Sequence, residues 1–399
     1  MKILIWNDFP LKARQGGPST YLFNLKKSVE SNKIQNITFL NNKDPRIKKV
    51  RTTKFTYFYK NVFRKNIFKF FFGNNFEANR KIKKTIKFHT TPIELPEGIR
   101  LNEYSHIHFH TTYSYYKAKE ILKDFKGKVL LTSHSPKATH IEIIEDLLYG
   151  FSLKEDEREV LRKIDEFAFS NTDYVIFPCI EAQEPYFNSW SDYKNIQRKN
   201  KVVEFLTCCS EANIKRTKED VFREYNIPKG SFVITYFGRH NEVKGFDVLK
   251  RFGKEVLKKY PNIYFLIAGT EEPLRGLKHE RWIEVGWTND PHSIVSAADL
   301  YILPNKETYF DLALLEVLSI GTTSLLSTTG GNKYFKRLPE SETGGLFYYN
   351  NTLDDMLKTF EFIYENKSEI NNQNKEIFKK YFDNKNFAVN YLSMIETLK

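Results

Sequence analysis

Two cations in the second half of the chain have the type and spacing of an anion site. Arg239 and Lys244 lie in GRHNEVKG (238–245), which follows an apolar run and leads into a helical pattern. A helix N-terminus with two nearby cations suits a diphosphate, because backbone N–H groups and positive charge favour the same ligand. From the spacing alone, a solvated basic turn is the alternative.

Glu316 interrupts the apolar run FDLALLEVLSIG (310–321). A carboxylate buried without a partner is costly, so Glu316 needs one. It could accept both hydroxyls of a cis-diol, which makes a ribose one candidate partner; a core Arg or Lys is the other. The predicted helix begins near Phe310, and the backbone N–H groups of its first turn, from Tyr309 to Leu312, would face the same anion.

Two glycine pairs also follow predicted strands. Gly330 and Gly331 lie in TTGGN (328–332), and Gly16 and Gly17 lie in QGGPS (15–19). Each pair allows a ligand to approach the backbone closely, with a plain turn as the alternative. QGGPS does not match the spacing G-x-G-x-x-G, so a dinucleotide fingerprint is not supported.

Three histidines lie on or after predicted strands of the first half. His134 ends KVLLTSH (128–134), so we expect it at the carboxyl edge of a sheet, where ligands bind. His108 and His110 alternate in HIHFH, and for His108 a structural role is favoured. No carboxylate or cysteine completes a recognisable metal-binding spacing, so no metal is predicted.

Two sets of alternating strands and helices must position these residues. This alternation predicts the α/β class, with two doubly wound, mostly parallel sheets. The predicted strands of the first set are 2–6, 37–40, 106–110, 128–134, 174–177 and 202–206, with helices at 19–30, 113–124 and 154–170. Those of the second set are 232–238, 263–269, 282–286, 299–304 and 322–328, with helices at 244–259, 290–298, 310–320 and in the tail, 352–399.

The bulk composition agrees with two globular domains. A chain of 399 residues is longer than a typical single core. The apolar runs are all shorter than the roughly 18 residues of a membrane span. The three cysteines show neither metal spacing nor a disulfide framework, so a reducing cytoplasm is the simplest compartment. The start, MKILIWNDF, reads as a strand rather than a secretory signal.

The net charge of +13 is concentrated in one segment. Residues 43–87 hold 15 Lys or Arg and two acids, and the rest of the chain is neutral overall. Within it, KFTYFYKNVFRKNIFKFFF (54–72) predicts a basic amphipathic helix suited to an anionic membrane or a lipid-linked acceptor. A core role for its aromatics is the alternative, and no motif supports nucleic-acid binding. The predicted surface comprises Lys60, Phe63, Arg64, Lys65, Ile67, Lys69, Phe70 and Phe71.

Taken together, these stretches resemble the retaining glycosyltransferases of family 4, which have the GT-B fold. The resemblance covers nearly the whole chain. It implies an acceptor-binding Rossmann-like domain, 1–207, completed by a last helix, 384–399, that crosses back, and a nucleotide-sugar domain, 208–383. The stretches that carry it are QGGPSTYLFNL (15–25), TSHS (132–135), YFGRHNEVKGFDVL (236–249), LIAGTEE (266–272), VGWTND (285–290) and ETYFDLALLEVLSIGT (307–322) with the following GGN.

The resemblance also implies roles for single residues. Arg239 and Lys244 match the pair that neutralises the donor diphosphate, and Glu316 matches the glutamate that holds the donor ribose. Gly16 and Gly17 match the loop that approaches the donor, and His134 matches a histidine near the transferred sugar. The backbone of Phe310, Asp311 and Leu312 matches the segment that meets phosphate and sugar.

One position departs from the family pattern. The family places a first glutamate eight residues before the second, and here that position is Thr308, with Glu307 one residue earlier. Either Glu307 acts from a shifted register, or Thr308 replaces the carboxylate by a hydroxyl. The second case puts sugar recognition in doubt.

The implied activity is a retaining, metal-independent hexosyl transfer without a cofactor. The donor is a nucleotide-diphosphate sugar, with a UDP-sugar favoured over a GDP-sugar. The acceptor is a lipid-linked or cell-surface bacterial polysaccharide. The catalytic residues expected are His134, Glu307, Arg239 and Lys244, in an enzyme peripheral to the inner face of the cell membrane. A non-catalytic GT-B partner subunit, which Thr308 favours, and a GT-B sugar-nucleotide epimerase are the alternatives.

Overall fold

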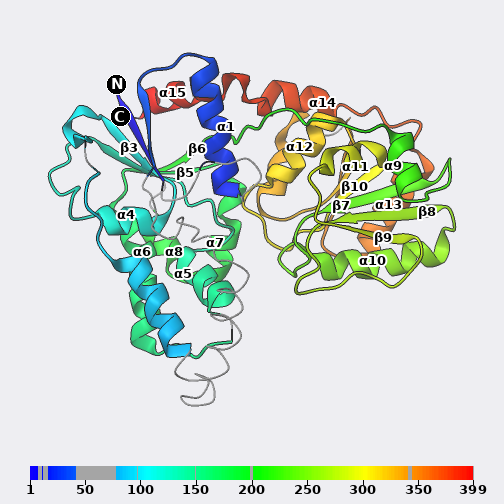
Figure 1. Ribbon diagram of the computed structural model, residues 1–399, viewed down its shortest axis with the longest axis horizontal. Helices are drawn as coiled ribbons and strands as arrows, with labels where there is room; N and C mark the ends of the chain where they lie inside the picture. The colour runs from blue at the N-terminus through cyan, green and yellow to red at the C-terminus, as the bar shows by residue number, and fades with distance from the viewer. Residues whose placement is uncertain are drawn as a thin grey trace, which may run out of the picture. The chain divides into compact units, whose positions relative to one another are not determined.

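The computed structural model describes residues 1–7, 11, 17–41, 78–96, 98–148, 150–197, 201–339 and 344–398. Within them the chain forms two six-stranded sheets with helices on their faces (Figure 1). The strand pairs with a defined register are parallel in both sheets, which confirms the predicted doubly wound α/β class. None of the described helices is long and apolar enough to cross a membrane.

The first sheet has the strand order β2-β1-β3-β4-β5-β6. All residues of β1 and β3 are buried, as expected for parallel strands covered on both faces. The strands are β1 (Ile3–Asn7), β2 (Ile37–Asn41), β3 (His106–Phe109), β4 (Lys128–Leu131), β5 (Tyr174–Phe177) and β6 (Val202–Glu204). The helices are α1 (Gly17–Ser31), one over 78–90, α4 (Thr112–Ala118), α5 (Thr139–Glu142), α6 (Glu155–Asn171), α7 (Glu184–Ser189) and α8 (Tyr193–Ile196).

The second sheet has the strand order β12-β11-β10-β7-β8-β9. Its strands are β7 (Phe232–Phe237), β8 (Ile263–Ala268), β9 (Trp282–Gly286), β10 (Leu300–Leu303), β11 (Ser324–Ser327) and β12 (Leu346–Tyr349). The helices of this half are α9 (Lys218–Glu224), α10 (Phe246–Lys259), α11 (Pro291–Ala297), α12 (Leu312–Ile320), α13 (Leu353–Glu365), α14 (Asn374–Ile377) and α15 (Phe387–Thr397), with a 3-10 helix, η7 (Gly330–Arg337).

The chain divides into two compact units. The first unit is Met1–Thr20, Lys33–Ile176 and Tyr186–Val203, and the second unit is Tyr21–Asn32, Phe177–Pro185 and Glu204–Lys399. The domains expected from the sequence, 1–207 with 384–399 and 208–383, stay a prediction, because compact units need not be independently folding domains.

The last helix returns to the first helix of the chain, as predicted. The backbone N–H of Ala388 in α15 donates to Ser28 Oγ in α1 at 3.0 Å. The side-chain amide of Asn32 donates to the carbonyl of Lys385 at 2.8 Å. In Figure 1 the red α15 lies beside the blue α1. These contacts fasten the two ends of the chain to each other.

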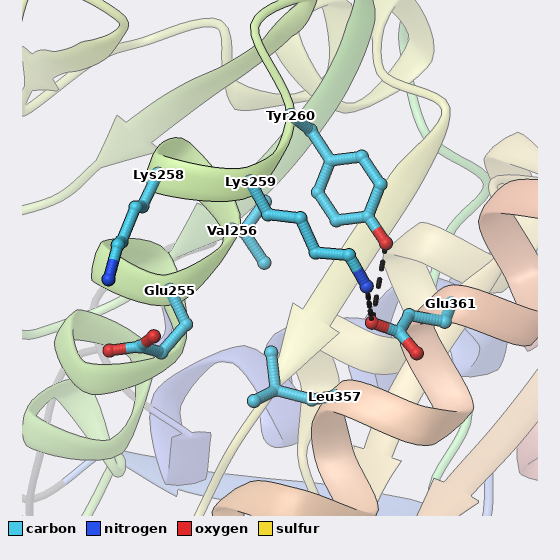
Figure 2. A pocket seen from close by; sticks show the side chains of 7 residues that line it. All are labelled: Glu255, Val256, Lys258, Lys259, Tyr260, Leu357 and Glu361. Carbon is cyan, nitrogen blue, oxygen red and sulfur yellow. Dashed lines mark hydrogen bonds and ion pairs between the residues drawn. The ribbon is translucent and has the colours of Figure 1, made fainter.

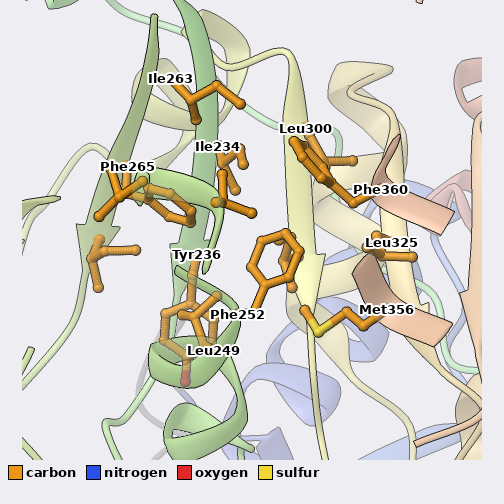
Figure 3. Close-up of a cluster of buried hydrophobic side chains, with 14 of the residues drawn as sticks. Ile234, Tyr236, Leu249, Phe252, Ile263, Phe265, Leu300, Leu325, Met356 and Phe360 are labelled. Carbon is orange, nitrogen blue, oxygen red and sulfur yellow. The ribbon is translucent and has the colours of Figure 1, made fainter. Parts of the chain in front are cut away.

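The core of the second unit lies between its sheet and the helices α10 and α13. Figure 3 shows Tyr236 of β7, Phe265 of β8 and Leu300 of β10 facing Phe252 of α10 and Phe360 of α13. All five side chains are completely buried. This rigid layer carries the loops at the carboxyl ends of β7 and β10, which hold the residues predicted to bind an anion.

Several elements differ from the predicted ones. The helix α12 begins at Leu312 rather than Phe310, because Asp311 is its N-cap and bonds to the N–H of Ala313. The helix α4 ends at Ala118 rather than near residue 124. The strand β12, LFYY (346–349), was not predicted.

Candidate functional site

The candidate site lies at the topological switch point of the second sheet. The strand β7 pairs with β8 on one side and with β10 on the other, so the chain order reverses there. The loops after β7 and β10 meet, since the backbone N–H of Lys306 donates to the carbonyl of Val243 at 3.0 Å. Gly245 has a φ of +67°, and a Cβ on it would lie 1.8 Å from the carbonyl oxygen of Pro304, so only glycine fits.

This meeting brings Lys244 against Asp311. Lys244 Nζ lies 2.5 Å from Asp311 Oδ2, which also accepts a 2.9 Å hydrogen bond from the side-chain amide of Asn305. Asp311 Oδ1 accepts from the N–H of Ala313 at 3.1 Å. Burial raises the pKa of Asp311, but the charge of Lys244 and the hydrogen bonds outweigh it, so the pKa of this carboxyl lies below its usual value. Asp311 is therefore ionised at neutral pH. It already accepts a hydrogen bond from one backbone N–H of the first turn of α12, that of Ala313.

Arg239 differs from Lys244 in that its side chain is exposed and makes no ion pair with the described residues. Its backbone carbonyl accepts a 2.8 Å hydrogen bond from the hydroxyl of Tyr236, which fixes the start of the loop. The backbone N–H of Lys244 donates to Asn241 Oδ1 at 2.9 Å, which fixes its end. The two cations thus project from one rigid loop, one paired and one directed to solvent.

Glu316 is paired with a histidine rather than with a core Arg or Lys. His292 Nε2 lies 3.0 Å from Glu316 Oε2, and the Glu316 side chain is 18% exposed. His292 lies in the first turn of α11 and is 4% exposed. This partner was missed, although the sequence placed a helix at 290–298 after the resembling stretch VGWTND.

The glycine pair in TTGGN is explained by a backbone contact. A Cβ on Gly330 would lie 2.2 Å from the carbonyl oxygen of Thr308, and one on Gly331 would lie 2.1 Å from that of Tyr309. The N–H of Gly331 also donates to the carbonyl of Thr308 at 3.3 Å. The pair therefore allows η7 to lie directly against the loop before α12, and close approach to a ligand is not needed to account for it.

The same loop carries the two residues that compete for the role of the family's first glutamate. Thr308 is 4% exposed, whereas Glu307 is partly buried and its backbone N–H lies 3.4 Å from the carbonyl of Val243. Phe310 is 8% exposed and stacks on Phe335, with 5.6 Å between ring centroids. Leu312 is the first residue of α12. Phe310 thus belongs to the core by its side chain, and its backbone is the part near the site.

A buried histidine in the cation loop was also missed. His240 is completely buried and stacks on Phe246, and neither of its ring nitrogens has a hydrogen-bond partner among the described residues. Its Nε2 lies 3.9 Å from Glu284 Oε2. Burial lowers the pKa of His240 to about 4 and raises the pKa of Glu284 to about 7. At neutral pH His240 is uncharged, so the two side chains do not form an ion pair.

In the first unit, the predicted histidines form a row at the carboxyl ends of β3 and β4. His108 Nε2 lies 2.9 Å from Thr132 Oγ1, and His110 Nδ1 lies 2.8 Å from His134 Nε2. Burial lowers the pKa of His134 to about 3 and, with the neighbouring rings, holds the pKa of His108 and His110 well below their usual range. His134 has a φ of +58°, a conformation that residues with a Cβ adopt at a cost.

The remaining predicted site residues lie at or beyond the limits of the described residues. Gly17 begins α1, is exposed, and has no atom within 4 Å of where a Cβ would lie. Gly16 and the predicted membrane or acceptor surface, Lys60, Phe63, Arg64, Lys65, Ile67, Lys69, Phe70 and Phe71, lie outside the described residues. Among the described residues, no group of three potential ligands could hold a metal.

A separate hollow lies on the helices α10 and α13. Figure 2 shows Lys259 and Tyr260 both directed at Glu361. Lys259 Nζ and the hydroxyl of Tyr260 both donate to Glu361 Oε1, at 2.6 Å and 3.3 Å. Lys259 is the last residue of α10 and Tyr260 follows it, whereas the cation loop precedes the first turn of this helix. The hollow is therefore at the other end of this helix from the candidate site.

Comparison with known proteins agrees with this geometry. Residues 231–366 match the family model described as glycosyl transferases group 1, a segment that contains both cations, Asp311, Glu316 and His292. Over this segment the chain is similar to the group 1 glycosyltransferases. Over its full length it superposes on sucrose-phosphate synthase from Thermosynechococcus elongatus with a TM-score of 0.66 at 16% identity, covering 98% of that chain. It superposes on Anabaena HepE in complex with UDP and glucose with a TM-score of 0.60 at 11% identity, with both chains covered completely. The fold is GT-B, as predicted.

Individual proteins of described activity match only part of the chain. One is the Escherichia coli UDP-Gal:alpha-D-GlcNAc-diphosphoundecaprenol alpha-1,3-galactosyltransferase, 26% identical over 152 residues, which are 35% of this chain and 38% of that protein. Another is a glycogen synthase of Clostridium botulinum, 25% identical over 190 residues, which are 43% of this chain and 38% of that protein. The matches thus span about two fifths of the length of these relatives.

Proposed function

We propose that this protein is a retaining glycosyltransferase that moves a hexose from a nucleotide-diphosphate sugar to a hydroxyl of a glycan acceptor. The observation that supports the proposal most is the contact of Lys244 with Asp311 at the N-terminus of α12, at the switch point of the second sheet, with the exposed Arg239 on the same loop as Lys244. Glu316 lies one turn further along the same helix. These are the groups needed for a diphosphate and a ribose.

The Lys244–Asp311 pair fits a site that exchanges partners. When a diphosphate binds, Lys244 can turn to it while Asp311 keeps the hydrogen bonds from Asn305 and from the N–H of Ala313. Asp311 then keeps two hydrogen bonds, which offset part of the cost of releasing the lysine. Arg239, which has no described ion-pair partner to leave, is the cation that a diphosphate meets without such an exchange.

In the proposed reaction the bond between the anomeric carbon and the diphosphate breaks while the acceptor oxygen bonds to the same face of that carbon. The departing phosphate oxygen takes the acceptor proton. Arg239 and Lys244 stabilise the negative charge that develops on the leaving group, so no metal or cofactor is required of the protein. Burial holds the pKa of His134 at about 3, so this residue is too weak a base to remove a proton. It orients a hydroxyl instead, and Glu307 is the carboxylate proposed to contact the sugar.

The relatives suggest what the donor and acceptor are. The Escherichia coli relative is described as using UDP-Gal and a diphosphoundecaprenol-linked acceptor, and HepE was solved with UDP and glucose. By this analogy the donor here is a UDP-sugar and the acceptor a lipid-linked or cell-surface polysaccharide, handled at the inner face of the cell membrane. The basic composition of residues 43–87 is consistent with an anionic surface.

One observation favours a second function, a non-catalytic partner subunit of a glycosyltransferase complex. Thr308 stands where the family has a glutamate, and its backbone is fixed by Gly331, so the loop has little freedom to change register. A protein that binds donor but does not turn it over would have this role. Donor binding and turnover must therefore be measured separately.

The first experiment is a thermal-shift titration with UDP, GDP, ADP and CMP on the wild type, Lys244→Ala and Lys229→Ala. Lys229 is exposed just before β7, at the opposite end of that strand, so its variant removes the same charge away from the site. We expect one diphosphate to stabilise the wild type and Lys229→Ala but not Lys244→Ala. Release of sugar from the matching donor would then establish turnover, and binding without release would support the partner subunit. Equal shifts in all three proteins, or none at millimolar nucleotide, would refute the assigned diphosphate site.

A further inference from the structure

We infer that His292 is a positioning residue, which orients Glu316 so that the site selects ribonucleotides over nucleotides without the ribose cis-diol. This inference rests on the proposed function, in which Glu316 accepts the ribose hydroxyls. What it adds is a second residue, from a different helix, on which the ribose contact depends.

The hydrogen bonds around His292 define its tautomer. The backbone N–H of Asn213 donates to His292 Nδ1 at 2.9 Å. Because a backbone N–H can only donate, Nδ1 must carry a lone pair, and the ring proton is on Nε2. Nε2 is the atom 3.0 Å from Glu316 Oε2, so the imidazole donates to the carboxylate while remaining uncharged. Protonating the ring would break the bond with Asn213.

The surrounding contacts fix both helices that carry the pair. Ser293, next to His292 in α11, accepts hydrogen bonds from the backbone N–H groups of Lys215 and Arg216 at 2.9 Å and 3.0 Å. In α12, Ser319 accepts from the N–H of Ala212 at 2.9 Å and donates to the carbonyl of Glu316 at 2.7 Å. One extended segment, 212–216, therefore anchors α11 and α12, and the imidazole has little room to move.

The consequence for Glu316 follows from the kind of partner it has. A lysine or arginine would neutralise the carboxylate, as Lys244 does for Asp311. A neutral imidazole donates one hydrogen bond and leaves the full negative charge, which strengthens hydrogen bonds from a ligand. Oε2 accepts the hydrogen bond from His292. Oε1 accepts no hydrogen bond from the described residues and is not buried. The carboxylate is thus oriented by one oxygen with acceptor capacity left for a cis-diol.

Asparagine and glutamine separate the two hydrogen bonds of His292. The side-chain oxygen of Asn reaches about where Nδ1 lies, so His292→Asn can still accept from Asn213 but does not reach Glu316. The side-chain nitrogen of Gln reaches about where Nε2 lies, so His292→Gln can still donate to Glu316 but leaves Asn213 unpaired. A purely structural role would make the two variants comparable in nucleotide selection, whereas a positioning role separates them.

The test is calorimetric titration with UDP and with 2′,3′-dideoxyuridine diphosphate, which share the base and the diphosphate. In the wild type we expect UDP to bind at least about tenfold more tightly, the effect of one or more hydrogen bonds to a charged group. In His292→Asn we expect the ratio of the two dissociation constants to fall below about threefold, with binding of the dideoxy ligand unchanged. In His292→Gln and in Ser293→Ala, which alters only the anchor of α11, the ratio should stay near that of the wild type.

Each other result counts against a specific statement. If the wild type binds neither ligand, nor ADP and GDP, the proposed function fails and this inference fails with it. If the wild type binds both uridine ligands equally, or if a folded His292→Asn keeps the wild-type ratio, the proposed function stands and the role of His292 is refuted. Should His292→Asn not fold, a folded His292→Gln that has lost the ratio refutes it instead.

Discussion

The carboxyl ends of the two sheets carry different chemistry. In the first unit His108, His110 and His134 lie in a row, joined ring to ring, and all are uncharged at neutral pH. In the second unit the corresponding ends carry charges, with Lys244 bonded to Asp311 and an exposed Arg239 nearby. Neutral donors and acceptors suit the hydroxyls of a sugar, whereas fixed charges suit a diphosphate. Under the proposed function, the neutral side chains would serve the sugar and the charged ones the diphosphate.

The two groups also differ in how their side chains are held. In the second unit, Asp311 and Glu316 each keep a partner that a ligand need not displace, Asn305 for the first and His292 for the second. In the first unit, the row of rings ends in His134, whose φ of +58° is maintained by its surroundings. The charged site is thus pre-organised by hydrogen bonds, and the neutral one includes a strained backbone.

The largest effect that would test this contrast is on Lys244. Lys244→Ala removes a cation from the leaving group, so turnover on any accepted donor should fall on the order of 100-fold or more. It also leaves Asp311, 9% exposed, without its cation, and the free energy of unfolding should fall by about 2 kcal/mol. Steady-state kinetics and chemical denaturation measure the two losses.

The double variant Lys244→Ala/Asp311→Asn separates these losses. Asparagine is a good N-cap whose single side-chain oxygen can still accept from the N–H of Ala313. Its amide nitrogen can donate to Asn305 Oδ1, which has no hydrogen-bond partner among the described residues, once the Asn305 amide turns over. The stability of the double variant should therefore return toward that of the wild type. Turnover should stay low, since the cation is still missing. Recovery of turnover along with stability would mean that Lys244 has only a structural role, and the contrast between the two units would be lost.

The fold was predictable because the strands are short buried runs in regular alternation with helices. The runs FVITYF (232–237) and IYFLIA (263–268) are β7 and β8 over the predicted residues. The switch point then follows from the strand order, which the sequence does not show directly. It is this order, with β7 between β8 and β10, that brings the loop of Lys244 against that of Asp311.

The hydrogen-bond partners of the site residues could not be predicted from the sequence. His292 lies 24 residues before Glu316, and only the packing of α11 on α12 joins them. For Gly330 and Gly331 a ligand-binding turn and a plain turn both stayed open, because a glycine pair has the same sequence whether a ligand or a neighbouring loop approaches it. The sequence shows His240 next to Arg239, but it does not show that His240 is buried.

We expect a smaller effect from lowering the pH, which should reduce the free energy of unfolding through His134 in the first unit. The unfolded chain protonates His134 near pH 6.5, but the folded state does so only near pH 3. The unfolded state therefore binds more protons between these values, and stability is lost as the pH falls below 6.5. His134→Asn removes this titration and tolerates a positive φ. Between pH 6.5 and 4.5 the free energy of unfolding of the wild type should fall by up to roughly 3 kcal/mol more than that of the variant. Denaturation curves at a series of pH values would show it, and parallel curves for the two proteins would contradict the burial of a neutral His134.

The smallest effect is expected from Glu284 in the second unit, and it has the opposite pH dependence. Burial raises the pKa of this carboxyl to about 7, so the folded state holds its proton between about pH 4.5 and 7. Its contribution to stability is then complete below pH 4.5 and is lost as the pH rises through 7. Glu284→Gln stays neutral and can still accept the 2.7 Å hydrogen bond from Trp282. At pH 8 the variant should be more stable than the wild type by about 2 kcal/mol, and at pH 5 the two should be equal.

The matched control for this last prediction is Glu271→Gln. Glu271 is exposed and acts on Glu284 only through its charge, so its variant should leave the pH dependence of unfolding nearly unchanged. A stabilisation of Glu284→Gln that is the same at pH 5 and pH 8 would show that the gain comes from packing. A gain confined to high pH would show that the second unit, whose proposed diphosphate site is charged, also carries a carboxyl that holds its proton to higher pH beside His240.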